Sequence, residues 1–412
     1  MIRDTLMQDR SPDDLLVVGA GVSGLAAAHY GRQQGWSVRV LESSDRPGGC
    51  LHSPIFPGSS GFWLELGAHT CFNSYGHLLD ILTDVDGLSA VIPKARLNYR
   101  LWVNGRDRFI PGQLHWGELL RSLPRLRSVH KASARVADYY GAMVGPRNYR
   151  EVLGPAFNAV ICQEAAEFPA ASLFRKRTRR KDQPKNFSFP GGLSWIVRRL
   201  TESLGERLLC GAEAVSVTSQ GDQGFEVVLA TGQRWQGRRL VLATPPQVAA
   251  GLLAGMAPAL SALLGEIQGV RVESLGVCVS ADQIAWPRLA GLIGVAEDFF
   301  SVVSRDYQRH IAPDLRGFTF HFRPGRLSLE EKRQQVARVL GVSPADFLAV
   351  TDTVHTLPAL RLGQNERVER MDGLLKGQPL ALTGNYFHGL SIEDCLVRTR
   401  AEIHRLAALC AG

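Results

Sequence analysis

The sequence has no run of 18 or more apolar residues, and its first segment, MIRDTLMQDRSPDD, has no apolar stretch. The first absence argues against a transmembrane helix and the second against a signal peptide. The seven cysteines are scattered, with no CxxC pair and no Cys/His cluster at zinc spacing. We therefore expect a protein of the cytoplasm with buried or free thiols and no metal site.

Length and net charge limit the number of domains and the kinds of partner that the chain can have. At 412 residues the chain is too long for one ordinary core, so we expect two or perhaps three domains. The composition, 45% hydrophobic and 21% charged, is that of a globular protein. A net charge of +8 favours anionic partners: carboxylated substrates, an acidic membrane surface or nucleic acid. Charge alone does not choose among them.

A β-α-β unit opens the chain. The apolar run Leu15–Val18 enters a glycine-rich turn, a helical pattern follows to about Gly35, and a second apolar run, Val38–Leu41, completes the unit. The glycines therefore lie at the turn from the first strand into the helix.

The glycine spacing predicts a dinucleotide site. Gly19, Gly21 and Gly24 fit G-x-G-x-x-G, in which the first permits a tight turn, the second lets backbone approach a pyrophosphate, and the third lets helix pack on strand. Glu42 lies 18 residues after Gly24, where an acid accepts hydrogen bonds from the adenosine ribose. A glycine-rich packing turn with a solvated Glu42 is the alternative, but it does not explain the ordering.

A second turn follows Glu42, and it distinguishes an FAD site from an NAD(P) site. Arg46-Pro47-Gly48-Gly49 resembles the flavoprotein family of amine oxidases, protoporphyrinogen oxidases and phytoene desaturases. The resemblance implies that Arg46, Gly48 and Gly49 lie along the pyrophosphate and ribityl chain of FAD. A simple NAD(P) fold has no need of this turn, so FAD is favoured.

Two stretches in the middle of the chain agree with this resemblance. Phe189–Leu193 resembles the family's Gly-Gly-Leu turn before a helix. The stretch from Leu209 to Val217 resembles the strand that brackets adenine, which implies a contact from Ala214.

The stretch Leu382–Asp394 resembles the closing motif of protoporphyrinogen oxidases. The resemblance implies FAD contacts from Gly384, Asn385, Ser391 and Ile392. A helix that starts near Ser391 would turn its positive dipole end toward the negative charge of reduced flavin. A C-terminal helix capped by Ser391 or Asp394, with no cofactor role, explains the local pattern equally well.

FAD accepts a hydride, so the protein has to position the donor, exclude water and stabilise charge. Amine oxidases typically place a lysine near the flavin from the later substrate segment, but between Glu266 and Asp372 the only lysine is Lys332, in a charged helical pattern. No cysteine occurs between Cys278 and Gly384, so nothing matches the residue that carries covalent FAD in some relatives. The expectation is FAD held non-covalently, with amine oxidation disfavoured.

Protoporphyrinogen oxidases bind a planar, carboxylated tetrapyrrole, which needs apolar walls and a cationic contact. The stretch from Tyr99 to Gly105 resembles the strand with that family's carboxylate-binding arginine, which implies a role for Arg100, although Tyr99 fits the key position as well. An exposed charge on a strand is the other interpretation.

Two histidines are candidate catalytic residues. Gly67-Ala68-His69 lies where family members bring backbone against flavin, and it resembles UDP-galactopyranose mutase, which isomerises its substrate with reduced FAD. His69 could polarise the flavin or act as an acid or base near neutral pH, and His388 has a similar standing as a cavity residue. A hydrogen-bonded structural histidine is the alternative for both.

Six of the seven residues 175–181 are cationic, and leucines and arginines interleave over 119–127 around Pro124. These basic segments have three interpretations. The first is solvated surface and the second is peripheral contact with the inner face of an anionic membrane. Nucleic-acid binding comes last, because no recognised motif accompanies the charge.

We therefore expect an α/β protein with a discontinuous, Rossmann-like FAD domain and an inserted α+β substrate domain. The FAD domain takes residues 12–85, 186–255 and 376–412, and the substrate domain takes 86–185 and 256–375. The leading function is FAD-dependent removal of hydride from an organic small molecule, similar to protoporphyrinogen oxidase, with oxygen or a quinone as acceptor. The alternatives are an amine oxidase or desaturase, a mutase-like flavin isomerase, and a flavin-binding protein without activity.

Overall fold

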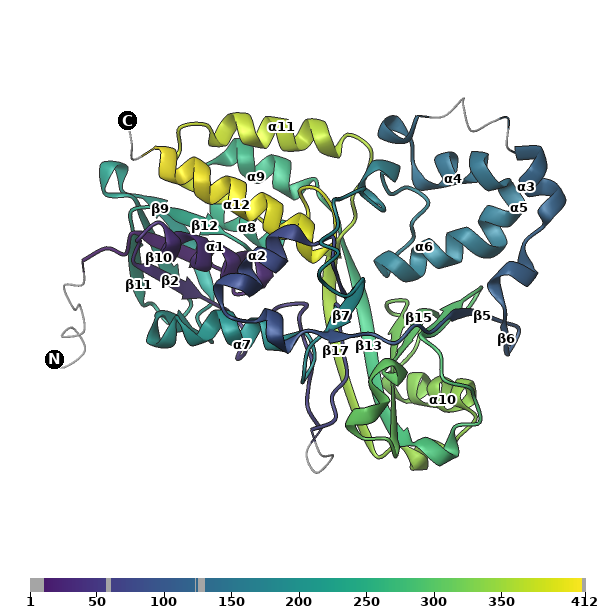
Figure 1. The fold of residues 1–412 in the computed structure, drawn as a ribbon. Helices are drawn as coiled ribbons and strands as arrows, with labels where there is room; N and C mark the ends of the chain where they lie inside the picture. Colours follow the sequence, from purple (N-terminus) through teal and green to yellow (C-terminus); the bar gives the residue numbers. More distant parts are fainter. Residues whose placement is uncertain (1–10, 57–60, 123, 125–129, 410–412) are drawn as a thin grey trace.

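The computed structural model describes residues 11–56, 61–122, 124 and 130–409. Figure 1 shows a parallel sheet with helices on both sides, a mixed sheet beside it, and a helical insertion that extends past the mixed sheet.

The parallel sheet has the order β18-β12-β1-β2-β8, and every neighbouring pair in it is parallel. Each strand is short and, apart from Arg39 in β2, apolar, as expected where helices cover both faces. The strands are β1 (Leu15–Val18), β2 (Val38–Leu41), β8 (Leu208–Leu209), β12 (Leu240–Leu242) and β18 (Leu380–Leu382).

Alternate residues of this sheet enter two different cores. Leu15 and Val17 pack with one set of helices, whereas Leu16 and Val18 pack with a second set and a small antiparallel sheet. The first set is α1 (Val22–Gln33), α2 (Gly76–Asp84), α7 (Ser194–Glu202) and α12 (Ile392–Ala408). The second side has α8 (Pro246–Leu253), α9 (Pro258–Gly265), α11 (Gln364–Leu375), β9 (Ala214–Ser219), β10 (Phe225–Leu229) and β11 (Arg234–Gly237).

The mixed sheet has the order β17-β13-β16-β15-β14-β5-β6. All of its pairs are antiparallel except β14 with β5. Its strands are β5 (Tyr99–Val103), β6 (Arg106–Arg108), β13 (Gly269–Ser280), β14 (Gly291–Gly294), β15 (Phe299–Ser304), β16 (Leu315–Phe322) and β17 (Ala349–Pro358).

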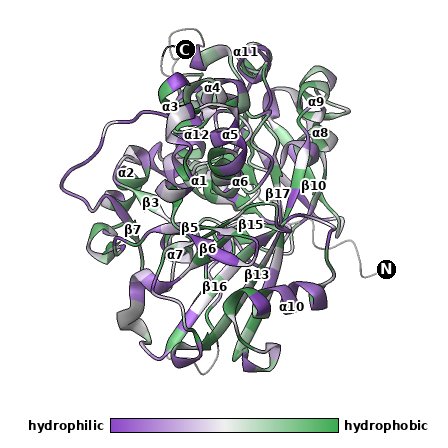
Figure 2. Ribbon diagram, turned by 90° about the vertical axis from the view of Figure 1, so that its right-hand side faces the viewer, coloured by the Kyte–Doolittle hydropathy of each residue, from purple (hydrophilic) through white to green (hydrophobic). Residues whose placement is uncertain are grey.

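The two faces of the mixed sheet differ in chemistry. One face supplies Leu275, Phe318 and Phe320 to a core shared with α10 (Leu329–Leu340), which Figure 2 shows as a largely hydrophilic helix on the outside. The opposite face carries small and polar residues, because Ser274 lies opposite His321 and Gly276 lies opposite Thr319 in the strand register. This second face is called the polar face below.

Smaller elements connect these units. The helical insertion has α3 (Trp116–Ser122), α4 (Val136–Val144), α5 (Pro146–Asn148) and α6 (Gly154–Ile161), and β3 (Cys71–Phe72), β4 (Ile92–Pro93) and β7 (Asn186–Ser188) form a small antiparallel sheet. The expected interfacial segment over 119–127 falls partly on 123 and 125–127, which lie outside the described residues.

None of the helices in the described ranges has the length and apolar composition that a bilayer crossing requires.

The expected fold class, α/β with a Rossmann-like sheet and a second sheet, is confirmed. The five parallel strands fall within 12–85, 186–255 and 376–412, and all seven mixed-sheet strands fall within the expected substrate segments 86–185 and 256–375. The domain boundaries themselves stay a prediction.

Candidate active site

The predicted cofactor residues converge on one edge of the parallel sheet. The strand register aligns Val18 with Leu41 and Leu242, and Leu242 with Leu382. Gly19, Glu42 and Gly384 follow these aligned positions within two residues, at the carboxyl ends where open α/β sheets bind ligands.

The three glycines of the first turn have different surroundings. Gly19 has φ +98°, in the region that favours glycine. A Cβ on Gly24 would lie 1.8 Å from the Gly19 carbonyl oxygen, so helix and turn pack without room for a side chain. A Cβ on Gly21 would meet nothing within 4 Å. The turn is thus closed toward the protein and open at Gly21, as a pyrophosphate site beside the free N–H groups of α1 requires.

Glu42 is held at this edge. Its Oε2 accepts a hydrogen bond of 2.6 Å from the Ala20 N–H, and its Oε1 accepts one of 2.9 Å from the Ser44 N–H. Its backbone pairs with the segment before Ala214, since the Ala212 N–H donates to the Glu42 carbonyl at 2.7 Å. The structure thereby brings the adenine-side segment next to the acid, with Ala214 partly buried at the start of β9.

The second glycine turn lies directly against the first. The Gly48 N–H donates to the Ala20 carbonyl at 2.8 Å, and Gly48 and Gly49 have φ +113° and +54°. The Arg46 guanidinium donates to the carbonyl of Gly49 at 3.2 Å, and burial lowers the pKa of Arg46. Both turns therefore form one backbone-lined surface.

Thr244, which follows β12 at the same edge, was not among the residues predicted from sequence. Its side chain is 9% exposed, and no group in the described part of the chain hydrogen-bonds to its Oγ1. An unpartnered buried hydroxyl is costly, so it indicates a ligand or water at this position. Its place at the end of a predicted strand, beside Gly19, was the available signal.

The C-terminal motif forms the expected turn and capped helix. Gly384 has φ +152°, Asn385 is partly buried and Ile392 is 6% exposed. Ser391 caps α12 with its hydroxyl, which accepts the Asp394 N–H at 3.1 Å, while the Asp394 carboxylate accepts the Ser391 N–H at 3.2 Å. This reciprocal capping box fixes where the helix begins.

His69 and His388 lie in different surroundings. His69 Nδ1 is 2.9 Å from Thr70 Oγ1, and burial, with Lys94 nearby, lowers the pKa of His69 well below its ordinary value. His388 is partly buried beside Phe387, and burial, with Arg175 nearby, lowers its pKa. Within the described part of the chain, no hydrogen bond or ring contact joins the two histidines.

Three further histidines accompany His69. His321 and His355 lie on the polar face of the mixed sheet, and His355 Nε2 is 3.3 Å from a Cβ position on Gly67. His321 is 3% exposed and its Nδ1 is 2.9 Å from Ser274 Oγ. Burial lowers the pKa of His52, His321 and His355 to about 4. We call His52, His69, His321 and His355 the histidine group.

The histidine group is uncharged at neutral pH because burial penalises the imidazolium form. Over the described residues, no three His, Cys, Asp or Glu side chains are placed to share a metal ion. The group therefore offers neutral imidazoles beside the backbone of Gly67, which follows the cofactor turns in the chain. The sequence signal for it was the small-and-polar alternation along β13, β16 and β17.

Comparison with known proteins identifies the family. Residues 22–288 match the family described as "Flavin containing amine oxidoreductase", which is more than half of the chain. The chain belongs to the flavin-containing amine oxidoreductase family. Membership implies FAD as cofactor and an oxidoreductase acting on a small molecule.

Two relatives and one solved structure show how far the likeness extends. The flavin-dependent L-tryptophan oxidase RebO of Lentzea aerocolonigenes is 42% identical over 74 residues, 18% of this chain and 16% of that protein. The L-amino acid dehydrogenase of Synechocystis sp. is 23% identical over 333 residues, 70% of this chain and 68% of that protein. The crystal structure of the "Putative protoporphyrinogen oxidase" from Exiguobacterium sp. 255-15 has a TM-score of 0.79 at 16% identity, covering 96% of this chain and 98% of that one. The last likeness shows the fold alone.

In this flavin-containing amine oxidoreductase, two lysines have different places. Lys332 lies in the first turn of α10, as the helical pattern predicted, and its ammonium pairs with Glu273 rather than facing solvent. Lys94, which was not predicted from sequence, donates to the His69 carbonyl at 3.0 Å and to Thr70 Oγ1 at 2.7 Å. Burial lowers the pKa of Lys94 to about 8.

Arg100 is not brought together with the other predicted site residues. It lies opposite Leu292 in the register, on the apolar side of the mixed sheet, and its guanidinium pairs with Asp107 near the surface. Tyr99, one residue earlier, points to the polar face beside Gly291. Alternation along the strand decides this, because successive side chains point to opposite faces.

Proposed function

We propose that this chain is an oxidoreductase that binds FAD non-covalently and removes a hydride from a small organic molecule held against the polar face of the mixed sheet. The observation that supports this most is the place of the histidine group. The Ala68 N–H donates to the Cys50 carbonyl at 3.0 Å, so the backbone next to the second glycine turn carries Gly67 directly to His355. A substrate on the polar face would then adjoin the cofactor edge.

Different residues would hold the different parts of FAD and contact the substrate. The Gly19–Gly24 turn and the start of α1 would hold the pyrophosphate, Glu42 the ribose, and Arg46 with Gly48 and Gly49 the adjoining chain. FAD, when bound, supplies the hydride acceptor. His321, whose Nδ1 lies 2.9 Å from Ser274 Oγ, is neutral at pH 7 and would offer the substrate a hydrogen-bonding imidazole rather than a charge.

A porphyrinogen-like substrate with oxygen or a quinone as acceptor is our leading proposal. The closing motif from Gly384 and the full-length fold likeness support it. Because Arg100 lies on the other face, a substrate carboxylate would need another cation. Lys94 suits this role: its hydrogen bonds go to neutral oxygens, its ammonium lies 3.8 Å from the centre of the Tyr307 ring, and among the described residues no carboxylate lies within ion-pair distance of it, although Glu65 acts on it at longer range.

Oxidation of an amine or an amino acid is the second candidate. Lys94 beside His69 supports it. Amine oxidases typically supply a lysine near the flavin from the later substrate segment, and here Lys94 supplies one from an earlier segment, next to the backbone of His69. The two relatives named above are an L-tryptophan oxidase and an L-amino acid dehydrogenase, which makes amino acids natural test compounds.

The first experiment is anaerobic absorbance of the purified protein between about 350 and 500 nm, where oxidised flavin absorbs. A porphyrinogen, an aromatic L-amino acid and a primary amine are added separately. Bleaching by the porphyrinogen, with porphyrin fluorescence, supports the leading proposal, and bleaching by an amino compound supports the second. A Lys94→Met variant should lose the response to carboxylated compounds, whereas Lys332→Met should keep it.

Other outcomes overturn these proposals. Flavin that stays oxidised with every donor indicates a binding protein without this activity. Turnover that needs a reductant but leaves the substrate without net oxidation indicates a flavin isomerase. Purified protein without FAD would contradict the cofactor site itself.

A further inference from the structure

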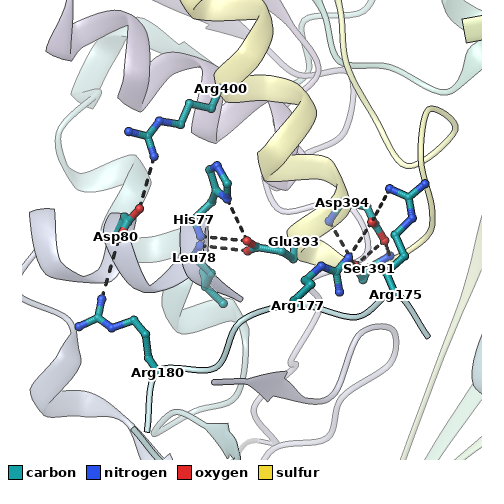
Figure 3. Close-up of polar contacts among 10 residues, drawn as sticks. All are labelled: His77, Leu78, Asp80, Arg175, Arg177, Arg180, Ser391, Glu393, Asp394 and Arg400. Atoms are coloured by element: carbon teal, nitrogen blue, oxygen red, sulfur yellow. Dashed lines mark hydrogen bonds and ion pairs between the residues drawn. The ribbon is translucent and has the colours of Figure 1, made fainter. Parts of the chain in front are cut away.

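The basic run, residues 175–181, is not a uniformly solvated surface. Arg175, Arg177 and Arg180 are partly buried, whereas Lys176 and Arg179 are exposed. Figure 3 shows that the three inward arginines reach acids on α12 and α2. The basic run, which the cofactor site does not explain, therefore contacts α12, the helix that begins at the cofactor edge.

Arg177 makes the closest of these contacts. Its Nη2 donates to Asp394 Oδ1 at 2.7 Å and to Ser391 Oγ at 3.2 Å, and Arg175 Nη1 lies 3.8 Å from the same carboxylate oxygen. Asp394 is 6% exposed, so this ion pair is largely out of water and is weakly screened. The capping box and the basic run thus share one carboxylate (Figure 3).

The first turn of α12 carries two acids, Glu393 and Asp394. Acids at a helix N-terminus balance its positive dipole, and unpaired they would oppose an anion there. Glu393 is directed to the start of α2, where its carboxylate accepts the His77 N–H at 3.0 Å and pairs with His77 Nδ1 at 2.9 Å. Asp394 instead stays on the cap of α12, where Arg177 pairs with it and neutralises its charge.

We propose that Arg177, assisted by Arg175, neutralises Asp394 so that the N-terminus of α12 stays positive toward reduced flavin and thereby raises the reduction potential of the bound FAD. This inference rests on the proposed FAD site. The unpartnered, nine-tenths buried Thr244 hydroxyl at the same sheet edge is the independent sign of a ligand there. Arg177 is a positioning residue, because it acts on the cofactor through Asp394 and the helix.

The test measures the midpoint potential of bound FAD in the full chain, by reductive titration with a reference dye. Arg177→Gln should lower the potential, because an unpaired Asp394 disfavours the anionic reduced flavin. Asp394→Asn should raise it by removing that charge. We expect a change of about tenfold in the ratio of reduced to oxidised FAD for each, about 30 mV for a two-electron couple. The double variant should return close to the parent value.

Arg179→Gln is the matched control, since it removes the same charge from an exposed position of the same run, and it should leave the potential unchanged. Arg177→Lys should keep most of the parent potential, and with Asp394→Asn it carries the test if Arg177→Gln does not fold. Equal potentials in Arg177→Gln, Asp394→Asn and Arg179→Gln, with FAD retained, overturn this inference alone. A parent protein without FAD overturns the proposed function and this inference with it.

Discussion

The Ala20 N–H donates a hydrogen bond of 2.6 Å to Glu42 Oε2, so the acid that ends β2 closes the glycine turn that follows β1. Two segments separated by a whole helix are thereby fixed as one surface. The carboxylate is also held by the Ser44 N–H, which leaves it no freedom to swing into water.

Replacing Glu42 tests this surface. Glu42→Ala removes the acceptor of a nearly buried N–H and any contact with the ribose, and hydrogen bonds to charged groups contribute roughly 1.5–3 kcal/mol. We expect FAD to bind at least about tenfold more weakly, measured by titrating FAD into the stripped protein. Glu42→Gln, which keeps an acceptor oxygen, should lose less. Parent-like affinity in Glu42→Ala would contradict the assignment.

The two turn glycines Gly21 and Gly24 should respond differently to substitution. Gly21→Glu meets no atom of the chain at the Cβ position, so the protein should purify without FAD but fold with the Tm of the parent stripped of FAD. Gly24→Ala places Cβ 1.8 Å from the Gly19 carbonyl oxygen and should lower stability by about 1–3 kcal/mol even without cofactor. Thermal unfolding and the flavin spectrum separate the effects, and a yellow Gly21→Glu variant would argue against a pyrophosphate there.

A buried ion pair stabilises the end of the mixed sheet. Arg316 Nη2 lies 2.6 Å from Asp306 Oδ2, with side chains 4% and 1% exposed. Asp306→Ala leaves the guanidinium buried without its partner and should cost about 3–5 kcal/mol in urea unfolding. Asp298→Ala breaks the exposed pair with Arg326 and should cost at most about 1 kcal/mol. Equal effects would mean that Arg316 finds another partner.

Stability should fall as the pH drops below about 6.5. Burial holds the pKa of His321 at about 4, against 6.5 in the unfolded chain, so between these values only the unfolded state takes up a proton. The contribution of neutral His321 to stability is complete above pH 6.5 and is lost as the pH falls toward 4. His321 should account for about 2 kcal/mol of the loss between pH 7 and 5.

Urea unfolding at both pH values checks this. His321→Gln should lose less stability on acidification than the parent, whereas the exposed His404→Gln should behave as the parent does. An identical loss in His321→Gln and the parent would show that His321 is solvated in the folded state.

The cofactor edge was predictable from sequence because its signals are local. Gly19, Gly21 and Gly24 lie within one turn, and Ser391 with Asp394 within another, so backbone conformation and capping decide them over a few residues. The short apolar runs likewise predicted the strands of a doubly covered sheet. These parts of the fold were confirmed.

Only tertiary structure decided what lies around that edge. Strand alternation turned Arg100 to the apolar side of its sheet, and pairing between β13, β16 and β17 gathered His321 and His355 from distant segments. The role of the basic run was ambiguous from sequence, because partners of its charges lie far away in the chain: Asp394 is 217 residues from Arg177. The sequence by itself determined the glycine turns and the caps, whose physics is local. Burial, partners and charge state depend on long-range packing, and the fold alone set them.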